Sequence, residues 1–176
     1  MNERRRRMNG PLARLALMAA AVVTIVACSD NGTEPDASTE EQVAFIDNIV
    51  PHHQVANMMA DEAIAKAVHQ GLRNIAQRMK DDQTREIGEY LTIREQLTGA
   101  DTTPEPMMPA PMPGGPDFDR RWILMMIDHH QGAINNSLLA HGSGVESKLD
   151  SLAHHTIEEQ RREQEELRDS LNVWYP

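Results

Sequence analysis

The sequence contains one helical pattern twice, and this duplication is its strongest constraint on the fold. The triplet His-His-Gln occurs at residues 52–54 and again at residues 129–131, an offset of 77. The same offset aligns residues 45–89 with residues 122–166 without a gap. Because a register held over that length is typical of an internal repeat, we expect two copies of one structural unit.

Each copy predicts two helices joined by a short turn. In the first copy, Ser38 followed by Glu41 has the form of a capping box, and apolar residues at helical spacing continue to about Val68. Gly71 then ends the turn, and a second apolar periodicity runs over residues 72–97. The first repeat is therefore predicted to be a helical hairpin.

The second copy has the same organisation, with a helix from about Asp119 to His141. Ser143 with Glu146 predicts another capping box, which opens a last helix ending near Asn172. The segment between the repeats is rich in Pro, Gly, Thr and Met, and this indicates an irregular linker. Two hairpins joined by one long crossover predict an all-α four-helix bundle. The predicted segments are repeat one at 41–97, the linker at 98–118 and repeat two at 119–174, within a folded domain at 39–175.

The first 27 residues predict an export signal. They begin with a run of four arginines, and an apolar stretch over residues 15–27 ends at Cys28, the chain's only cysteine. This stretch is shorter than the ~20 residues that span a membrane. Residues 25–28, Ile-Val-Ala-Cys, resemble a bacterial lipobox, so we expect an exported lipoprotein that is acylated at Cys28, carries a flexible tether over residues 28–38 and faces the periplasm or cell exterior. An ordinary cleavable signal with a chance cysteine is the alternative.

The charge and the cysteine content limit the partners and the metal ligands that are expected for the mature chain. Loss of residues 1–27 takes away five arginines and one glutamate, which moves the formal net charge from −10 to −14. Nucleic-acid binding requires a basic face, so a nucleic-acid partner is not expected. With Cys28 acylated, a metal site in the folded domain has only His, Met and carboxylate ligands to use.

The apolar stripes of the second and fourth helices are interrupted at equivalent places. The interruption is Gln83 with Glu86 in the second helix, and Gln160 with Glu163 in the fourth. A carboxylate inside a bundle is costly unless another group pairs with it. Both repeats are therefore predicted to bury a polar group at the same level, and a partner is expected on the first and third helices.

Helical spacing turns His53 and His130 toward this polar break, with His52 and His129 about 100° round each helix. Methionines lie at neighbouring positions of the same helices and in the linker. Imidazole with thioether suits copper, because methionine sulfur favours Cu(I) and imidazole binds both oxidation states. The predicted metal ligands are His52, His53, Met58, Met59, Met125, Met126, His129 and His130, supported by Gln83, Glu86, Gln160 and Glu163.

Other interpretations are open at this point. In one, the histidines only bond the buried Gln and Glu, the methionines fill the core, and the protein is a non-metal structural or interaction module of the cell envelope. A redox enzyme is the least supported interpretation, because no substrate site can be identified. Copper binding for sequestration or transfer is the leading hypothesis, with another divalent metal as its nearest variant. His69, His141, His154 and His155 are not expected to be primary ligands.

Residues 45–54 and 122–134 resemble the two signature segments of the bacterial "domain of unknown function 305" family, and the resemblance covers about residues 40–174. It implies a ferritin-like four-helix bundle, often exported, with some members implicated in copper binding and resistance. The chain departs from the family pattern at Asn48 and Val50, where the first segment usually has Met-Ile, and at residues 135–136, where the second often has a Met. The positions that the resemblance marks are His52, His53, Met58, Met59, Met126, His129 and His130.

Overall fold

The computed structural model describes residues 37–140 and 145–176, and these two ranges form four α-helices and no strand. The predicted all-α bundle of two helical hairpins is confirmed. Within the described ranges no helix is both long and apolar enough to cross a membrane. The predicted export signal and the acylated Cys28 lie outside the described residues. The helices are α1 at Thr39–Lys66, α2 at Gln70–Thr98, α3 at Phe118–Ala140 and α4 at Ser147–Trp174.

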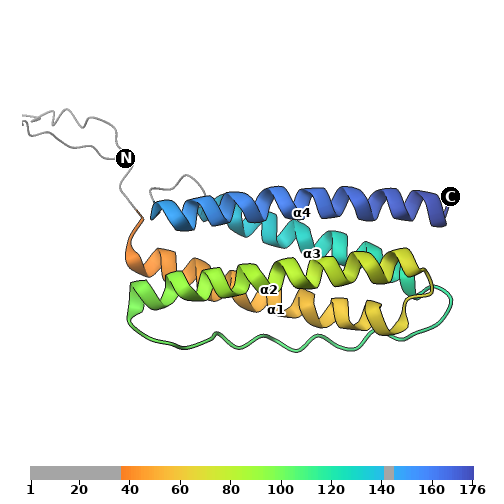
Figure 1. Ribbon diagram of the computed structural model, residues 1–176, viewed down its shortest axis with the longest axis horizontal. Coiled ribbons are helices and arrows are strands. Elements are labelled where there is room, and N and C mark those ends of the chain that lie inside the picture. Colours follow the sequence, from red (N-terminus) through yellow and green to blue (C-terminus); the bar gives the residue numbers. More distant parts are fainter. Residues whose placement is uncertain (1–36, 141–144) are drawn as a thin grey trace, which may run out of the picture. The chain divides into compact units, whose positions relative to one another are not determined.

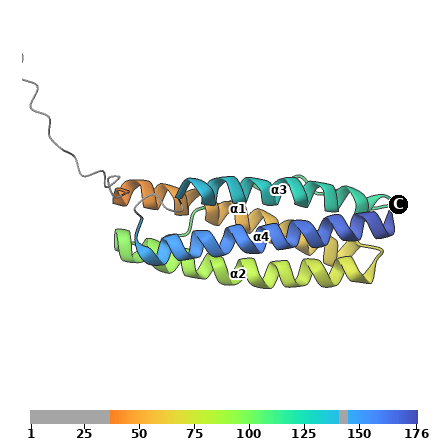
Figure 2. The ribbon, with the colours of Figure 1, turned by 90° about the horizontal axis from the view of Figure 1, so that it is seen from above.

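The helices pack as two antiparallel hairpins, α1 with α2 and α3 with α4 (Figures 1 and 2). Across the bundle α1 packs on α3 and α2 packs on α4. The indole Nε1 of Trp122 near the start of α3 donates to the carbonyl of Met59 at 2.7 Å, so α3 runs antiparallel to α1. In such an antiparallel pair equivalent positions of the two repeats meet at one level, where His52 lies against His129.

The crossover linker runs along the outside of the bundle from the end of α2 to the start of α3 (Figure 1). The Glu62 carboxylate accepts the Met112 backbone N–H at 2.9 Å, and Lys66 Nζ donates to the Met112 carbonyl at the same distance. Polar contacts to α1 therefore hold the Pro- and Met-rich segment against the bundle.

The helix starts confirm one capping prediction and correct another. At α1 the Glu41 N–H donates to Ser38 Oγ at 3.2 Å and the Ser38 N–H donates to Glu41 Oε2 at 2.8 Å, as a capping box requires. At α4 the prediction was wrong, because Glu146 is itself the N-cap and accepts the N–H groups of Lys148 and Leu149. The helix therefore begins after Glu146. Ser143 lies outside the described residues.

The core consists of two apolar clusters with a polar layer between them. One cluster fills the end near the α1–α2 turn, and the other fills the opposite end. Between them every helix contributes buried polar side chains, so the aliphatic core is interrupted at the middle of the bundle. The polar layer comprises His53 on α1, Gln83 and Glu86 on α2, His130 on α3, and Thr156, Gln160 and Glu163 on α4.

The end of α4 docks against the α1–α2 turn. The rings of His69 and Trp174 stack with centroids 4.5 Å apart and planes 4° from parallel. The fully buried Asp119 of α3 accepts the backbone N–H of His69 at 2.8 Å and pairs with its ring Nδ1 at 2.9 Å. Gly71 lies in the first turn of α2 rather than before it, and a Cβ added there would lie 2.8 Å from the Trp174 ring.

The substitution Gly71→Ala should displace Trp174 and shift its fluorescence to longer wavelength, because the added methyl group overlaps the indole. Gly88→Ala is the matched control, since no heavy atom lies within 4 Å of a Cβ at that position of the same helix. Gly88→Ala should raise the free energy of unfolding by about 0.5–1 kcal/mol, and Gly71→Ala should fall short of that gain. Unchanged fluorescence in Gly71→Ala would contradict this packing.

Candidate metal centre

Two equivalent histidine–glutamate pairs define the polar layer. His53 Nε2 on α1 lies 2.7 Å from Glu86 Oε2 on α2, and His130 Nε2 on α3 lies 2.8 Å from Glu163 Oε2 on α4. Each pair joins the two helices of one hairpin, and the pairs are related by the 77-residue offset of the repeat. Both imidazoles are fully buried. The prediction that His53 and His130 turn inward to the polar break is confirmed.

The second histidine of each triplet connects the hairpins to each other. The rings of His52 and His129 meet across the α1–α3 contact, with centroids 3.8 Å apart and planes tilted by 41°. His52 also lies 6.3 Å from His53, and His129 lies 6.5 Å from His130, centroid to centroid. The structure therefore brings the four predicted histidines together as a continuous row of imidazoles. We call His53, His52, His129 and His130 the imidazole row.

Several polar atoms of this layer are buried without a hydrogen-bond partner. They include Nδ1 of His52, His53 and His130, and the side-chain carbonyl oxygens of Gln83 and Gln160. Buried polar atoms are nearly always paired in folded proteins, so each unpaired atom calls for an explanation. In metal sites a histidine commonly donates one ring N–H to a carboxylate and coordinates through the other nitrogen. The His53 and His130 pairs have this arrangement, with Nε2 on the glutamate and Nδ1 available.

Three imidazoles of the row, those of His52, His129 and His130, are held in the neutral form. Burial, together with the charges of neighbouring histidines, lowers the pKa of His52 to about 3 and that of His129 to about 4. Burial likewise lowers the pKa of His130 to about 3. Neutral imidazole is the state that binds metal ions, so at neutral pH these rings need not lose a proton to become ligands.

The carboxyl group behind His130 is also neutral near pH 7. Burial, followed by the charges of Glu86 and Asp82, raises the pKa of Glu163 to about 8. With Glu163 protonated, the His130 ring donates Nε2–H to a carboxyl oxygen in the tautomer that leaves Nδ1 as an acceptor. A cation binding at His130 would favour the charged carboxylate, so metal binding here is expected to release a proton.

A glycine on α3 gives His52 the space that it occupies. A Cβ added to Gly132 would lie 2.9 Å from His52 Nε2. The offset of the repeat places Val55 at the equivalent position of α1. The surroundings of His52 and His129 therefore differ, because α3 has a glycine where α1 has a branched side chain.

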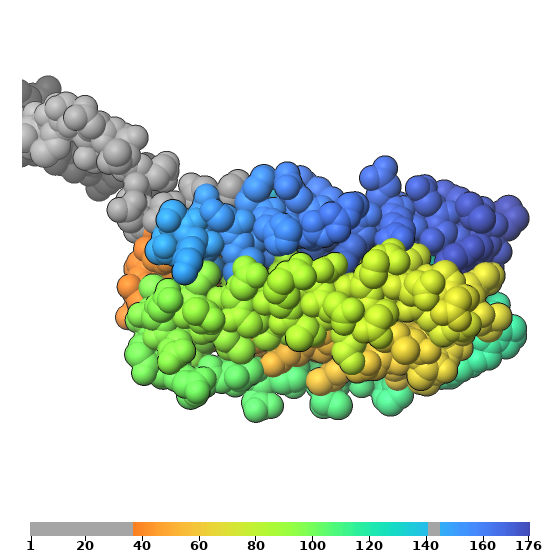
Figure 3. Space-filling view, in the orientation of Figure 1, coloured from red at the N-terminus to blue at the C-terminus, as the bar shows by residue number. Residues whose placement is uncertain are grey.

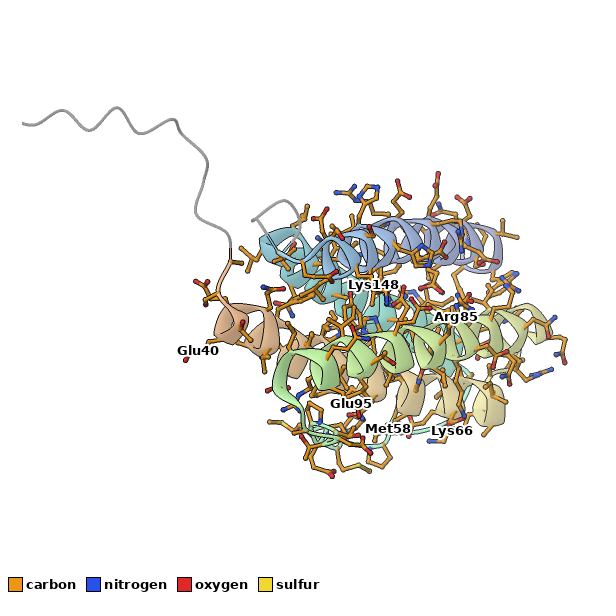
Figure 4. The ribbon with its side chains drawn as sticks, turned by 60° about the vertical axis from the view of Figure 1, so that its left-hand side comes forward. Glu40, Met58, Lys66, Arg85, Glu95 and Lys148 are labelled. Carbon is orange, nitrogen blue, oxygen red and sulfur yellow. The ribbon has the colours of Figure 1, made fainter. Side chains whose placement is uncertain are left out.

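The predicted methionine ligands fall into two environments. Met59 and Met126 are buried in the apolar cluster near the α1–α2 turn, in the packing role of the non-metal interpretation. Met125 is exposed, and Met58 lies on the side of α1 that the linker passes (Figure 4). The structure thus confirms the clustering of the histidines but does not gather the thioethers around them.

The donor atoms form a row rather than a cage. Among residues 37–140 and 145–176, no three side chains of the His, Cys, Asp and Glu types surround a common point closely enough to hold an ion. Ligation by more than two imidazoles would therefore require the rings to turn. The unpaired ring nitrogens fit a soft or borderline ion such as copper by their chemistry, because a cation of this kind tolerates a low coordination number.

Sequence reasoning set aside one residue that lies near this layer. His155 on α4 has its Nε2 3.8 Å from Glu86 Oε1, whereas His53 binds the other oxygen of that carboxylate. The sequence carried no signal for it, because the offset of the repeat aligns His155 with Arg78 and because α2 and α4 belong to different hairpins. Only the packing of α4 on α2 brings the two side chains together.

The metal-free protein should lose stability as the pH falls below about 6.5. The unfolded chain binds protons at His52, His129 and His130 near that pH, whereas the folded protein does not bind them until about pH 3–4. Glu163 acts in the opposite direction, since its contribution is present at low pH and is lost as the pH rises toward 8. As the pH falls from 6.5 to 4.5, the stability lost through the three imidazoles exceeds the stability gained through the one carboxyl group.

Urea unfolding at pH 7, 6 and 5 measures this effect, with a midpoint that decreases at each step. Replacing both His52 and His129 by Gln should reduce the decrease, because two of the three groups are removed. Equal midpoints of the wild type at pH 7 and pH 5 would contradict neutral, buried imidazoles at His52, His129 and His130.

Comparison with known proteins agrees with this architecture. CopM in its Ag-bound form, obtained by soaking, has a TM-score of 0.69 and 31% sequence identity, covering 77% of this chain and 98% of that chain. The Cu(I)-bound form of CopM has a TM-score of 0.68 with the same identity and coverage. A domain-of-unknown-function-305 fragment from Deinococcus radiodurans shares the fold at 18% identity, with a TM-score of 0.60 and coverage of 79% and 99%.

No functionally curated protein matches the chain. The sequence profile of "Domain of unknown function (DUF305)" matches it twice, over residues 30–94 and 95–171. The two matches correspond to the two hairpins, so each repeat carries the family pattern by itself. Together with the solved structures, these matches show that the chain belongs to the DUF305 family, as its His-His-Gln segments predicted.

Proposed function

We propose that this protein binds copper ions as cargo at the imidazole row between α1 and α3. The observation that carries the proposal is the contact of His52 with His129 at 3.8 Å, flanked by two histidines whose Nε2 atoms are held by glutamates. Nitrogen donors from both hairpins are thereby collected in one buried layer. The pairing of Nε2 with a carboxylate leaves Nδ1 of His53 and His130 as the coordinating atom.

A purely structural role explains this layer less well. The His53–Glu86 and His130–Glu163 pairs each join helices of one hairpin, so they fix the register within a hairpin. Between the hairpins, the hydroxyl groups of Tyr90 and Thr156 bond across α2 and α4 at 2.9 Å, whereas across α1 and α3 the rings of His52 and His129 meet without a hydrogen bond to each other. Three buried ring nitrogens without partners lower stability in the absence of a ligand. A layer that served only packing would be expected to pair them.

The similarity to CopM supports copper rather than another metal. Structures of that protein contain Cu(I), Cu(II) or Ag, and its Cu(II)-bound form is 32% identical to this chain over 98% of its own length. Ag(I) and Cu(I) are both soft ions, and the chain offers thioethers beside the row. We propose that Met58, Met59, Met125 and Met126 contribute to Cu(I) binding after local repacking, and that Gln83 and Gln160 orient the ligands.

The sequence also supports a proposal for the location of the protein. We propose that the chain is exported and anchored to the membrane through an acylated Cys28, with the folded domain facing the periplasm or cell exterior. An anchored domain with one buried copper layer suits sequestration of the ion or its transfer to a partner. The mature domain has a formal net charge of −14, which favours the approach of cations.

The double variant His52→Ala/His129→Ala should lose tight copper uptake, because it removes both donors at the contact between the hairpins. Binding is measured with Cu(I) and Cu(II) against a competing chelator at pH 7. His154→Ala is the control, since this neighbouring α4 histidine is exposed and pairs with Glu158. The proposal fails if the double variant, shown to be folded by circular dichroism, retains wild-type affinity.

Gly132→Ala should weaken copper binding while leaving the helices intact. The added methyl group would overlap His52 Nε2, so the ring must move away from His129. An alanine in a helix is otherwise favourable by about 1 kcal/mol over glycine, so global stability should not fall in parallel. Chelator competition and thermal unfolding, measured on the same preparation, separate the two effects. Wild-type affinity in this variant would show that the position of His52 does not matter.

A further inference from the structure

A second group of donor atoms lies on the other side of the bundle, at the contact between α2 and α4. The two carboxylate oxygens of Glu86 lie near different histidines. Oε2 binds His53 at 2.7 Å in the interior, whereas Oε1 lies 3.8 Å from Nε2 of His155 on α4. The side chain of His155 is 46% exposed and that of Glu86 only 4%. This carboxylate therefore separates the buried imidazole row from an imidazole at the surface.

The distance between His155 Nε2 and Glu86 Oε1 is too long for a hydrogen bond, but it allows both atoms to bind one ion. Bonds from a transition-metal ion to imidazole nitrogen and carboxylate oxygen are each about 2.0–2.2 Å long, so the two donor atoms lie about 2.9 Å apart at a right angle and about 4.2 Å apart in line. The observed 3.8 Å falls inside that interval. Both side chains can thus reach one cation without movement of α2 or α4.

The surroundings favour a cation at this place. The charges of Glu86, Asp82 and Glu159 all raise the pKa of Glu163, which shows how closely carboxylates crowd the α2–α4 contact. The nearby guanidinium groups hydrogen-bond to other carboxylates, Arg85 to Asp82 at 2.8 Å and Arg162 to Glu159, and Arg85 interacts with Glu86 only through its charge. Arg85 lies beside this contact in Figure 4. Neither arginine donates a hydrogen bond to Glu86 Oε1.

The pair spans both repeats, with Glu86 in the first and His155 in the second. The residue equivalent to His155 is Arg78, and its guanidinium pairs with Glu166 rather than with Glu163. The hairpin duplication therefore does not generate a symmetric copy of this pair. Figure 3 shows α2 and α4 side by side on one face, so an ion can approach this contact from solvent.

We infer that His155 and Glu86 Oε1 form a second, solvent-accessible site for a borderline divalent transition-metal ion, distinct from the imidazole row. Water molecules complete its coordination, because only two protein donors converge there. One imidazole and one carboxylate select Cu(II) over Cu(I), since the site offers no thioether. An ion on Oε1 also withdraws charge from the carboxylate that holds His53, so occupancy of the surface site should weaken binding at the row.

Stepwise addition of Cu(II) to the metal-free protein, followed by electron paramagnetic resonance, tests this inference. The wild type should show a tightly bound species and then one further, weaker equivalent with nitrogen and oxygen ligands. His155→Ala should lose that weaker equivalent and retain the tight one, whereas the matched variant His154→Ala should retain both. Loss of a half-exposed side chain leaves the fold intact, which circular dichroism checks.

The variant His52→Ala/His129→Ala separates this inference from the proposed function. It should retain the weaker equivalent while losing the tight one, because the row and the surface site use different histidines. If His155→Ala still binds the weaker equivalent, the second site is refuted and copper binding at the row stands. If the tight species survives in His52→Ala/His129→Ala while His155→Ala loses the weaker one, the proposed row is refuted and the surface site stands.

Discussion

The structure depends on the burial of two imidazole–carboxylate pairs in the middle of an aliphatic bundle. Isolated carboxylates are expensive in such an environment, and here each one is paired with a histidine of the adjacent helix at 2.7 or 2.8 Å. These pairs divide the core into two apolar clusters. The packing at both ends fixes the level at which α1 and α3 meet, and so brings His52 against His129.

Duplication explains the symmetry of the polar layer, and sequence differences between the two copies explain where that symmetry is broken. Equivalent residues supply the two histidine–glutamate pairs, so a single ancestral hairpin could have carried the basic arrangement. The copies differ at two equivalent positions: Gly132 corresponds to Val55, and His155 corresponds to Arg78. The first difference leaves space for the ring of His52, and the second puts an imidazole in one repeat where the other has a guanidinium. The two halves of the layer are therefore chemically distinct, although their helices superimpose in register along the sequence.

The ends of the bundle keep this layer in place. Asp119 accepts the N–H groups of Val68 and His69, which ties the start of α3 to the α1–α2 turn. The stacking of Trp174 on His69 adds the end of α4 to the same cluster. Because antiparallel neighbours are anchored at their ends, a slip of one helix by a turn would break these contacts. The polar layer would then lose its partners as well.

The sequence by itself determined the number of helices, their duplication and the inward direction of His53, His130, Glu86 and Glu163, because these features follow from local periodicity and from one offset of 77 residues. It could not place the α4 start at Glu146, since several polar residues there can serve as caps. Only the tertiary structure decided which helices touch across the bundle. It brought His52 onto His129, placed Met59 and Met126 in an apolar cluster, and set His155 beside Glu86. Contacts between hairpins depend on packing of the complete core, and no local pattern in the chain specifies them.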